Sequence, residues 1–179
     1  MIFEEKKLKS ERMYEGAILN LRRDTVTAPK GQALREVIEH NGAVAIVPLT
    51  KDNKVVMVKQ FRYPIGKTVL EIPAGKMEEG ETDTLETAKR ELREETGYSA
   101  RNFRYLGRIS PSVAYTEEVI HLYAATGLTK GETDFDEDEA IDILEYAFET
   151  IYSLAARGKL IDAKTIAAIF MAKMQLDIK

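Results

Sequence analysis

The hydrophobic and polar positions of the chain form short runs that predict mostly β-strands. Two runs, at residues 42–49 and 54–61, are largely apolar, which indicates strands buried on both faces in the centre of a sheet. Residues 51–53 predict a hairpin turn between these two strands. Runs rich in β-formers and bounded by turn residues predict further strands at 17–26, 34–39, 103–109, 119–125 and 141–148.

Helical spacing occurs at three places further along the chain. Apolar or small residues recur every three or four positions in 85–96, so we expect a helix there, with a capping Thr or Asp before it and Gly97 at its end. Similar patterns predict a short helix at 150–157 and a closing helix at 162–174, with Asp162 as its N-cap. Because strands outnumber helices and mix with them irregularly, we expect a mixed α/β (α+β) fold with a mixed sheet covered by helices.

Composition is typical of a soluble globular protein. The chain has 179 residues, a formal net charge of −4 at pH 7, 44% hydrophobic residues, no Cys and no Trp. At roughly 100–200 residues per domain, this length favours one domain with its own core. The lack of Cys excludes disulfide scaffolds, zinc ribbons and cysteine nucleophiles. Because neither a signal peptide nor a run of roughly 18 apolar residues is present, we expect a cytoplasmic protein with no membrane partner.

Acidic residues gather in two stretches, 71–97 and 132–149, while the rest of the chain is basic. A charge run is usually a solvated face. In the predicted helix, however, Glu91, Glu94 and Glu95 are spaced i, i+3 and i+4, so all three carboxylates lie on one face. Like charges at these spacings repel each other by a few tenths of a kcal/mol per pair. A hard divalent cation such as Mg²⁺ is the natural compensating ligand, since it binds carboxylate and phosphate oxygens together.

The segment around these carboxylates resembles the Nudix box, the signature of hydrolases that act on nucleoside diphosphates linked to another moiety. The pattern is Gly, five residues, Glu, seven residues, then Arg-Glu, an aliphatic, any residue, Glu-Glu, any residue, Gly and an aliphatic. This chain supplies Gly75, Glu81, Arg90, the three glutamates and Gly97. Its second gap holds one residue more than the pattern, and we expect that residue to lie before the helix begins.

Beyond the box, the chain is similar to the ADP-ribose pyrophosphatase branch of this family. One departure is Pro111, which lies closer to the box than the corresponding proline of that branch usually does. The matching segments, in order and spacing, are 36–40, 42–45, 58–62, 70–75, 110–111, 136–139 and 161–165.

This resemblance implies the organisation of the molecule. It implies a Nudix fold, in which helices sandwich a mixed β-sheet, with an antiparallel β extension at the N-terminus. Residues 1–40 would form that extension and serve dimerisation and substrate binding, and residues 41–179 would form the Nudix hydrolase domain. The branch further implies a homodimer in which each subunit completes the adenosine site of the other.

The resemblance also implies roles for individual residues. Two or three Mg²⁺ or Mn²⁺ ions would be held by Glu91, Glu95 and the carbonyl of Ala74, with Glu94 completing the shell and taking part in catalysis. The base that activates water would be Glu137 or Glu139, and a carboxylate suits this role because metal-bound water is already acidified. The residues that match substrate contacts are Arg35, Glu39, Arg62 and Pro111. Guanidinium groups suit a diphosphate because they bind two oxygens at once, although these arginines and the acidic loop also fit an ordinary solvated surface.

The expected function is therefore Mg²⁺-dependent hydrolysis of the pyrophosphate bond of ADP-ribose to AMP and ribose 5-phosphate. Another nucleoside diphosphate sugar or NADH remains open as the substrate. A non-catalytic sensor of such ligands would be marked by erosion of the glutamate cluster, which this sequence retains. An RNA hydrolase would need aromatic side chains for bases, and the absence of Trp with only 8% aromatic residues disfavours a nucleic-acid partner.

Overall fold

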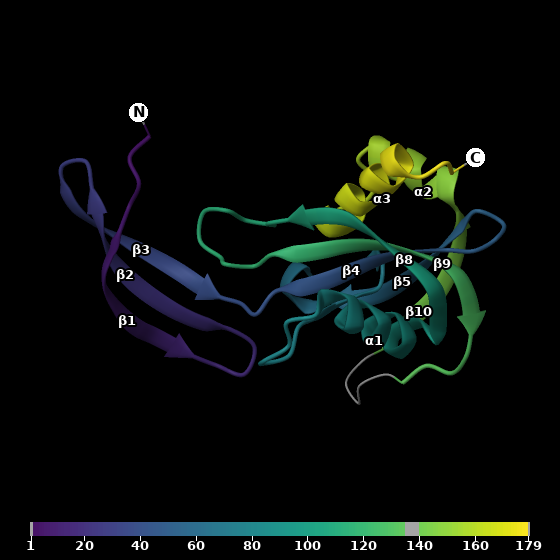
Figure 1. Cartoon of the computed structure of the whole chain (residues 1–179), viewed down its shortest axis with the longest axis horizontal. Coiled ribbons are helices and arrows are strands. Elements are labelled where there is room, and N and C mark those ends of the chain that lie inside the picture. The colour runs from purple at the N-terminus through teal and green to yellow at the C-terminus, as the bar shows by residue number, and fades with distance from the viewer. Residues whose placement is uncertain (1, 135–139, 179) are drawn as a thin grey trace. The chain divides into compact units, whose positions relative to one another are not determined.

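The computed structural model describes residues 2–134 and 140–178, which form two compact units (Figure 1). The first unit comprises Met1–Gly42 and Ser110–Val119, and the second comprises Ala43–Ile109 and Ile120–Lys179. The strands are β1 (Lys7–Glu15), β2 (Asn20–Ala28), β3 (Gly31–Glu39), β4 (Ala43–Leu49), β5 (Lys54–Arg62), β6 (Lys67–Glu71), β7 (Ala74–Lys76), β8 (Tyr98–Ile109), β9 (Ile120–Lys130) and β10 (Asp142–Ala147). The helices are η1 (Tyr63–Ile65), α1 (Thr84–Thr96), α2 (Phe148–Ala156) and α3 (Ala163–Gln175).

The second unit is built on a seven-stranded mixed sheet. Its main order is β10-β5-β4-β9-β8, with β6 paired to β5 and β7 paired to β4. The central pair β4 and β9 is parallel, whereas the other pairs are antiparallel. The predicted mixed sheet is therefore confirmed, with the two apolar runs of the sequence at its centre as β4 and β5.

Helices cover both faces of this sheet, as Figure 1 shows. Successive side chains of β4 point to opposite faces, as in any strand. Ala45 and Val47 pack in the larger core cluster, which includes Phe148 of α2 and Ile169 of α3. Val44 and Ile46 pack in a smaller cluster with Ala88 and Leu92 of α1. The sheet is thus sandwiched between α1 on one face and α2 with α3 on the other, as expected for a Nudix fold.

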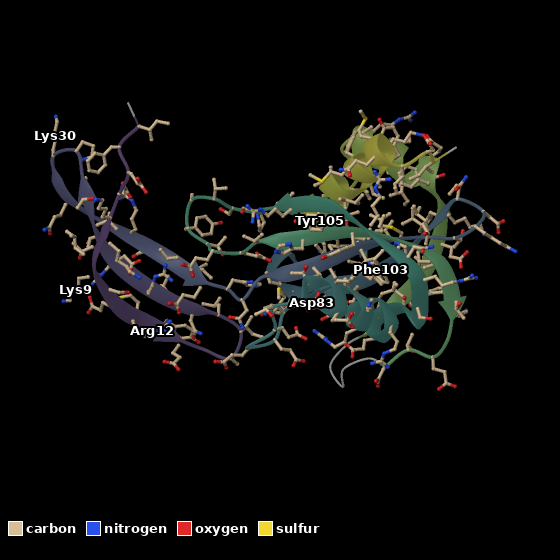
Figure 2. All side chains as sticks on the ribbon, in the orientation of Figure 1. Lys9, Arg12, Lys30, Asp83, Phe103 and Tyr105 are labelled. Carbon is tan, nitrogen blue, oxygen red and sulfur yellow. The ribbon has the colours of Figure 1, made fainter. Side chains whose placement is uncertain are left out.

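The first unit is a three-stranded antiparallel sheet in the order β1-β2-β3. Every residue of β1 is exposed, and among its three strands only Asp24 and Val26 are buried. Figure 2 shows the side chains of Lys9, Arg12 and Lys30 extending from this sheet. The sheet is held largely by backbone pairing and ion pairs, with little apolar burial in the described residues of one chain.

The connection between β8 and β9 belongs to the first unit. The amide of Ile38 donates to the carbonyl of Tyr115 at 2.7 Å, and the amide of Glu117 donates to the carbonyl of Ile38 at 3.0 Å. Arg22 binds the Glu117 carboxylate at 2.5 Å. Backbone pairing and one ion pair therefore attach this connection to β2 and β3.

The longest helices, α1 and α3, have 13 residues each. A bilayer span needs roughly 20 predominantly apolar residues. No helix in the described part of the chain meets that requirement.

Candidate active site

Helix α1 begins and ends where the sequence predicts. The side chain of Asp83 is the N-cap and accepts hydrogen bonds from the amides of Leu85 at 2.9 Å and Glu86 at 3.4 Å. Gly97 ends the helix with φ +70°, a left-handed conformation that costs glycine little, and its amide donates to the carbonyl of Arg93 at 2.7 Å. The apolar face of α1 packs on β4, and Glu91 and Glu95 point toward β7.

The extra residue of the box lies before α1, as expected, because the helix starts at Thr84 and the spacing of the three glutamates is unchanged. Glu81 still reaches back to the helix. Its Oε2 accepts from the amide of Glu78 at 2.8 Å and from Thr87 Oγ1 at 3.1 Å, and lies 3.5 Å from Arg90 Nη2. The hydrogen bond from Glu78, followed by those from Thr87 and Arg90, lowers the pKa of the Glu81 carboxyl against the opposing effect of burial. The ionised Glu81 carboxylate therefore links the loop before α1 to the helix.

Two glutamates of α1 are buried against β7. Glu91 is 8% exposed and Glu95 is 5% exposed. A Cβ atom added to Gly75 would lie 2.0 Å from the Glu91 Cδ atom, so the Glu91 carboxylate occupies the space that glycine leaves. The Glu95 Oε2 atom accepts from the amide of Ala74 at 3.0 Å. The structure thus brings together Ala74, Gly75, Glu91 and Glu95, which the sequence separates by up to 21 residues.

Arg90 bridges the carboxylates from within the same helix. Its Nη1 lies 2.8 Å from Glu91 Oε1 and 3.0 Å from Glu94 Oε2, and its Nη2 donates to the carbonyl of Lys76 at 3.2 Å. Arg93 Nη2 also donates to Glu94, at 3.0 Å. The guanidinium groups of Arg90 and Arg93 therefore compensate the negative charge of this helix face, and Glu94 is bound by both arginines.

In this arrangement, no three His, Cys, Asp or Glu side chains among residues 2–134 and 140–178 are grouped to hold a metal ion. The reason is local, since Arg90 Nη1 lies between Glu91 and Glu94, while Glu95 turns to a backbone amide. The donor set nevertheless fits a hard cation. Its side chains offer only carboxylate oxygens, two of the three carboxylates are buried, and Gly75 leaves room for one of them.

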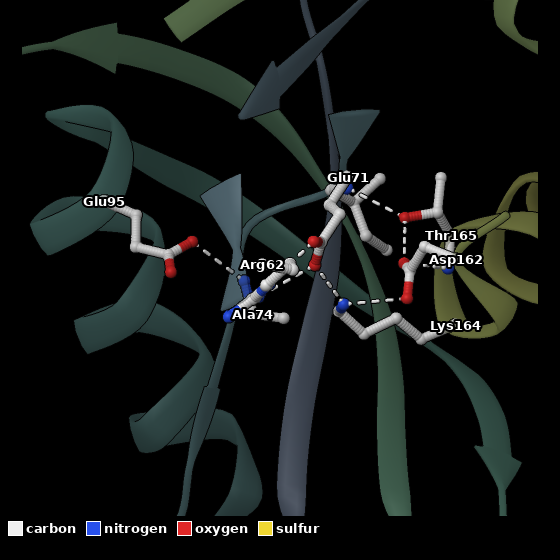
Figure 3. A network of polar contacts seen from close by, with 8 residues as sticks. Arg62, Glu71, Ala74, Glu95, Asp162, Lys164 and Thr165 are labelled. Carbon is white, nitrogen blue, oxygen red and sulfur yellow. Dashed lines mark hydrogen bonds and ion pairs between the residues drawn. The ribbon is translucent and has the colours of Figure 1, made fainter. Parts of the chain in front are cut away.

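A second polar network lies at the end of β6 (Figure 3). The Glu71 carboxylate, whose side chain is 3% exposed, accepts from Arg62 Nε at 2.8 Å and from Arg62 Nη2 at 2.9 Å. Lys164 Nζ of α3 donates to the same carboxylate at 2.5 Å and to Asp162 Oδ1 at 3.0 Å. Burial raises the pKa of Glu71, but Arg62 and Lys164 together outweigh it, so the pKa lies below its ordinary value. The hydrogen bond to Glu71 in turn raises the pKa of Arg62.

The remaining residues predicted for the substrate lie in the first unit. Arg35 binds Glu5 through both Nε, at 2.9 Å, and Nη2. Glu39 accepts from Arg22 Nη1 at 3.2 Å and also pairs with Arg12. Pro111 lies in the β8–β9 connection. The two candidate bases, Glu137 and Glu139, lie outside the described residues.

A family model described as the NUDIX domain matches residues 39–169. The chain belongs to the Nudix family. The resemblance inferred from the box at Gly75–Gly97 is therefore confirmed, and with it the Nudix hydrolase class. A crystal structure of an ADP compounds hydrolase matches this Nudix fold with a TM-score of 0.84, over 97% of this chain and 95% of that one. The two are 20% identical, so this likeness supports the fold alone.

Curated relatives cover nearly the whole of this Nudix chain. A methanol dehydrogenase activator of Bacillus methanolicus is 41% identical over 181 residues, which cover 99% of this chain and 97% of the relative. An ADP-ribose pyrophosphatase of Bacillus subtilis is 38% identical over 169 residues, which cover 93% and 91%. A GDP-mannose pyrophosphatase of Yersinia enterocolitica is 29% identical over 153 residues, which cover 80% and 79%.

Sequence reasoning missed the partners of Glu71. The segment 161–165 is part of the resemblance to the ADP-ribose pyrophosphatase branch, and Asp162 caps α3 as predicted, accepting from the amide of Thr165 at 3.0 Å. The pairing of Glu71 with Lys164 spans 93 residues. No local sequence pattern predicts such a contact. The nearest hint is that Lys164, a charged residue, follows the predicted cap Asp162 closely.

Proposed function

We propose that this Nudix protein hydrolyses the pyrophosphate bond of ADP-ribose, with Mg²⁺ or Mn²⁺ as cofactor, to AMP and ribose 5-phosphate. The observation that carries the proposal is the carboxylate face of α1 lying against Ala74 and Gly75 of β7. The 38% identity to an ADP-ribose pyrophosphatase over 93% of the chain supports this substrate.

Glu91, Glu94, Glu95 and the carbonyl of Ala74 would hold two or three divalent ions. When bound, such ions neutralise phosphate oxygens and lower the pKa of a coordinated water. Arg90 Nη1 contacts one oxygen of Glu91 and one of Glu94, so Arg90 and the ions would share these two carboxylates, each of which has further acceptor positions. Glu81, 3.5 Å from Arg90 Nη2, offers the guanidinium an alternative partner.

Arg35, Glu39, Arg62 and Pro111 would bind the substrate. A guanidinium can donate two parallel hydrogen bonds to neighbouring phosphate oxygens. Arg62 suits this role because it is 42% exposed and paired along only one of its edges. Glu137 or Glu139 would accept the proton of the attacking water, with Glu94 assisting.

We further propose that the protein is a cytoplasmic homodimer. The first unit supports this, because a three-stranded sheet with so little buried apolar surface is marginal in water without a partner layer. Its exposed apolar side chains offer such an interface, and they include Leu8, Met13, Ile18 and Leu34. Light scattering of the purified protein measures its mass directly, and a monomer at micromolar concentration would contradict this point.

Two alternatives have specific support. Hydrolysis of another nucleoside diphosphate sugar is favoured by the relative named GDP-mannose pyrophosphatase. A role as an activator of a methanol dehydrogenase is favoured by the 41% identity to the relative of that name.

The test is phosphate release coupled to alkaline phosphatase. This enzyme removes phosphate from the products AMP and ribose 5-phosphate but not from uncleaved ADP-ribose, in which both phosphates are esterified. ADP-ribose, GDP-mannose and NADH are compared, each with and without Mg²⁺, on the wild type and on Glu95→Gln. Glu86→Gln is the matched control, because Glu86 lies on the same helix and its side chain is 65% exposed. We expect ADP-ribose to lead by more than about tenfold in kcat/KM and Glu95→Gln alone to lose activity. A lead by another substrate, or full activity of Glu95→Gln, contradicts the proposal.

A further inference from the structure

Two cations share one buried carboxylate where β5, β6 and α3 meet. Glu71 is 2% exposed, so its charge is expensive to bury unless it is compensated. Arg62 binds it from β5 and Lys164 binds it from the first turn of α3 (Figure 3). Neither cation is as deeply buried, because the Arg62 side chain is 42% exposed and the Lys164 side chain is 14% exposed.

The geometry of Arg62 leaves one of its edges free. A guanidinium carries five N–H donors, one on Nε and two on each Nη. Glu71 takes the Nε and Nη2 edge, at 2.8 and 2.9 Å. Among the described residues, Arg62 makes no other hydrogen bond or ion pair. The edge formed by Nη1 and the second N–H of Nη2 therefore remains for an acceptor with two oxygens.

Arg62, Glu71 and Lys164 all line an open cavity of about 470 Å³. Pro64, Ile65 and Ile161 supply apolar walls. A charged group inside such a recess is less screened than one on a flat surface, so each unit of charge there matters more.

Charge balance gives Lys164 a specific task. Without Lys164, the three charges of Arg62, Glu71 and Asp162 around this cavity would sum to −1, which repels an anion. Lys164 Nζ contacts the same Glu71 carboxylate and is itself fixed by Asp162 Oδ1 at 3.0 Å. Lys164 therefore compensates Glu71 from the side of α3 and brings the network of two cations and two carboxylates to a net charge of zero.

We propose that Lys164 is a positioning residue of the pyrophosphate site, which compensates Glu71 so that Arg62 presents a free, positively charged edge to the diphosphate of the substrate. This inference rests on the proposed function in that Arg62 contacts the diphosphate. Lys164 itself acts through Glu71.

The experiment measures the affinity for inorganic pyrophosphate by calorimetry in EDTA, so that neither the metal nor turnover enters the result. Lys164→Met is expected to weaken binding by at least about tenfold, because the network around Arg62 then loses one positive charge and turns net negative. Lys164→Arg is expected to bind within about threefold of the wild type, since it keeps the charge. The double variant Glu71→Gln with Lys164→Met is expected to recover wild-type affinity within about threefold, because it removes the charge that Lys164 compensates. With ADP-ribose and Mg²⁺, Lys164→Met raises KM more than it lowers kcat.

A purely structural role of Lys164 gives a different result, because Lys164→Met would then lower the melting temperature while the folded protein still bound pyrophosphate like the wild type. The proposal is overturned if Lys164→Met binds pyrophosphate like the wild type, if the double variant stays as weak as the single one, or if the wild type does not bind pyrophosphate. If Lys164→Met does not fold, Glu71→Gln alone decides, and a tenfold loss of affinity in that variant overturns the proposal.

Lys173→Met is the matched control. Lys173 also lies on α3 and pairs with Glu149, but it has no contact with Glu71. It should lower the melting temperature without changing pyrophosphate affinity. The proposed function is tested separately. A wild type that binds pyrophosphate but does not hydrolyse ADP-ribose refutes that function, and the binding measurements on the variants still decide the role of Lys164.

Discussion

Replacing Gly75 by Ala should separate catalysis from stability. The added Cβ atom would lie 2.0 to 2.2 Å from the three carboxylate atoms of Glu91. An ordinary contact between non-bonded atoms is about 3.5 Å, so the carboxylate must move by about 1.4 Å. The backbone can stay in place, because the atoms that collide are the end of a flexible side chain.

A displacement of about 1 Å at a reacting centre can lower the rate about 100-fold. We expect Gly75→Ala to lose about that much in kcat/KM for ADP-ribose and to need more Mg²⁺ for half-maximal activity. Its free energy of unfolding should stay within about 1 kcal/mol of the wild type, a shift of roughly 2–4 °C in melting temperature. Steady-state kinetics over a Mg²⁺ series and calorimetric melting measure the two effects.

Gly80→Ala is the matched control, because it should show the opposite signature. Gly80 has φ +88° and nothing within 4 Å of an added Cβ, so alanine there is strained in the backbone but meets no atom. We expect it to cost about 1–2 kcal/mol in stability and to leave kcat/KM nearly unchanged. The reasoning on Gly75 is refuted if Gly75→Ala keeps its activity within about threefold, or if it loses stability as Gly80→Ala does.

Three further predictions concern stability. Asp83→Ala removes the N-cap of α1 and should cost about 1 kcal/mol of unfolding free energy, measured by urea titration, whereas an unchanged midpoint would mean that packing alone fixes the start of the helix. Glu71 has a pKa below its ordinary value of 4.5, so the stability it contributes is present above about pH 4.5 and is lost as the pH falls through the folded pKa. The urea midpoints of wild type and Glu71→Gln should therefore converge between pH 7 and pH 3, and a constant gap would argue against this linkage. Thr165→Val leaves the buried amide of Ile72 without its acceptor at 2.9 Å and should cost about 1–3 kcal/mol in urea unfolding, while Thr165→Ser should restore most of the loss.

The sequence by itself determined the parts of this protein that depend on neighbouring residues. Helix α1, its cap at Asp83 and its end at Gly97 follow from periodicity and turn chemistry over a few residues, and the common face of the three glutamates follows from helical geometry. The centre of the sheet was predictable for the same reason. Strands buried on both faces need continuous apolar runs, and β4 and β5 have them.

Strands that bury few apolar side chains could not be predicted from hydrophobic patterns. All nine residues of β1 are exposed, so its sequence shows no alternation, and the strand was not predicted. The edge strand β8 begins at Tyr98, five residues before the predicted start, because backbone pairing with β9 extends it beyond the apolar core. Hydrogen bonding to a neighbouring strand decides such elements, and the partner is distant in sequence.

The tertiary structure alone decided how the box is completed and held. Gly75 leaves space for the Glu91 carboxylate, Arg90 bridges two glutamates, and Lys164 reaches Glu71. Each of these contacts depends on how the helices and strands pack. Periodicity specifies which face of an element a residue occupies, but the partner across a gap is set by how the sheet and helices pack. The sequence therefore identified the chemistry of the carboxylate face, and the fold determined which cations and which backbone atoms meet it.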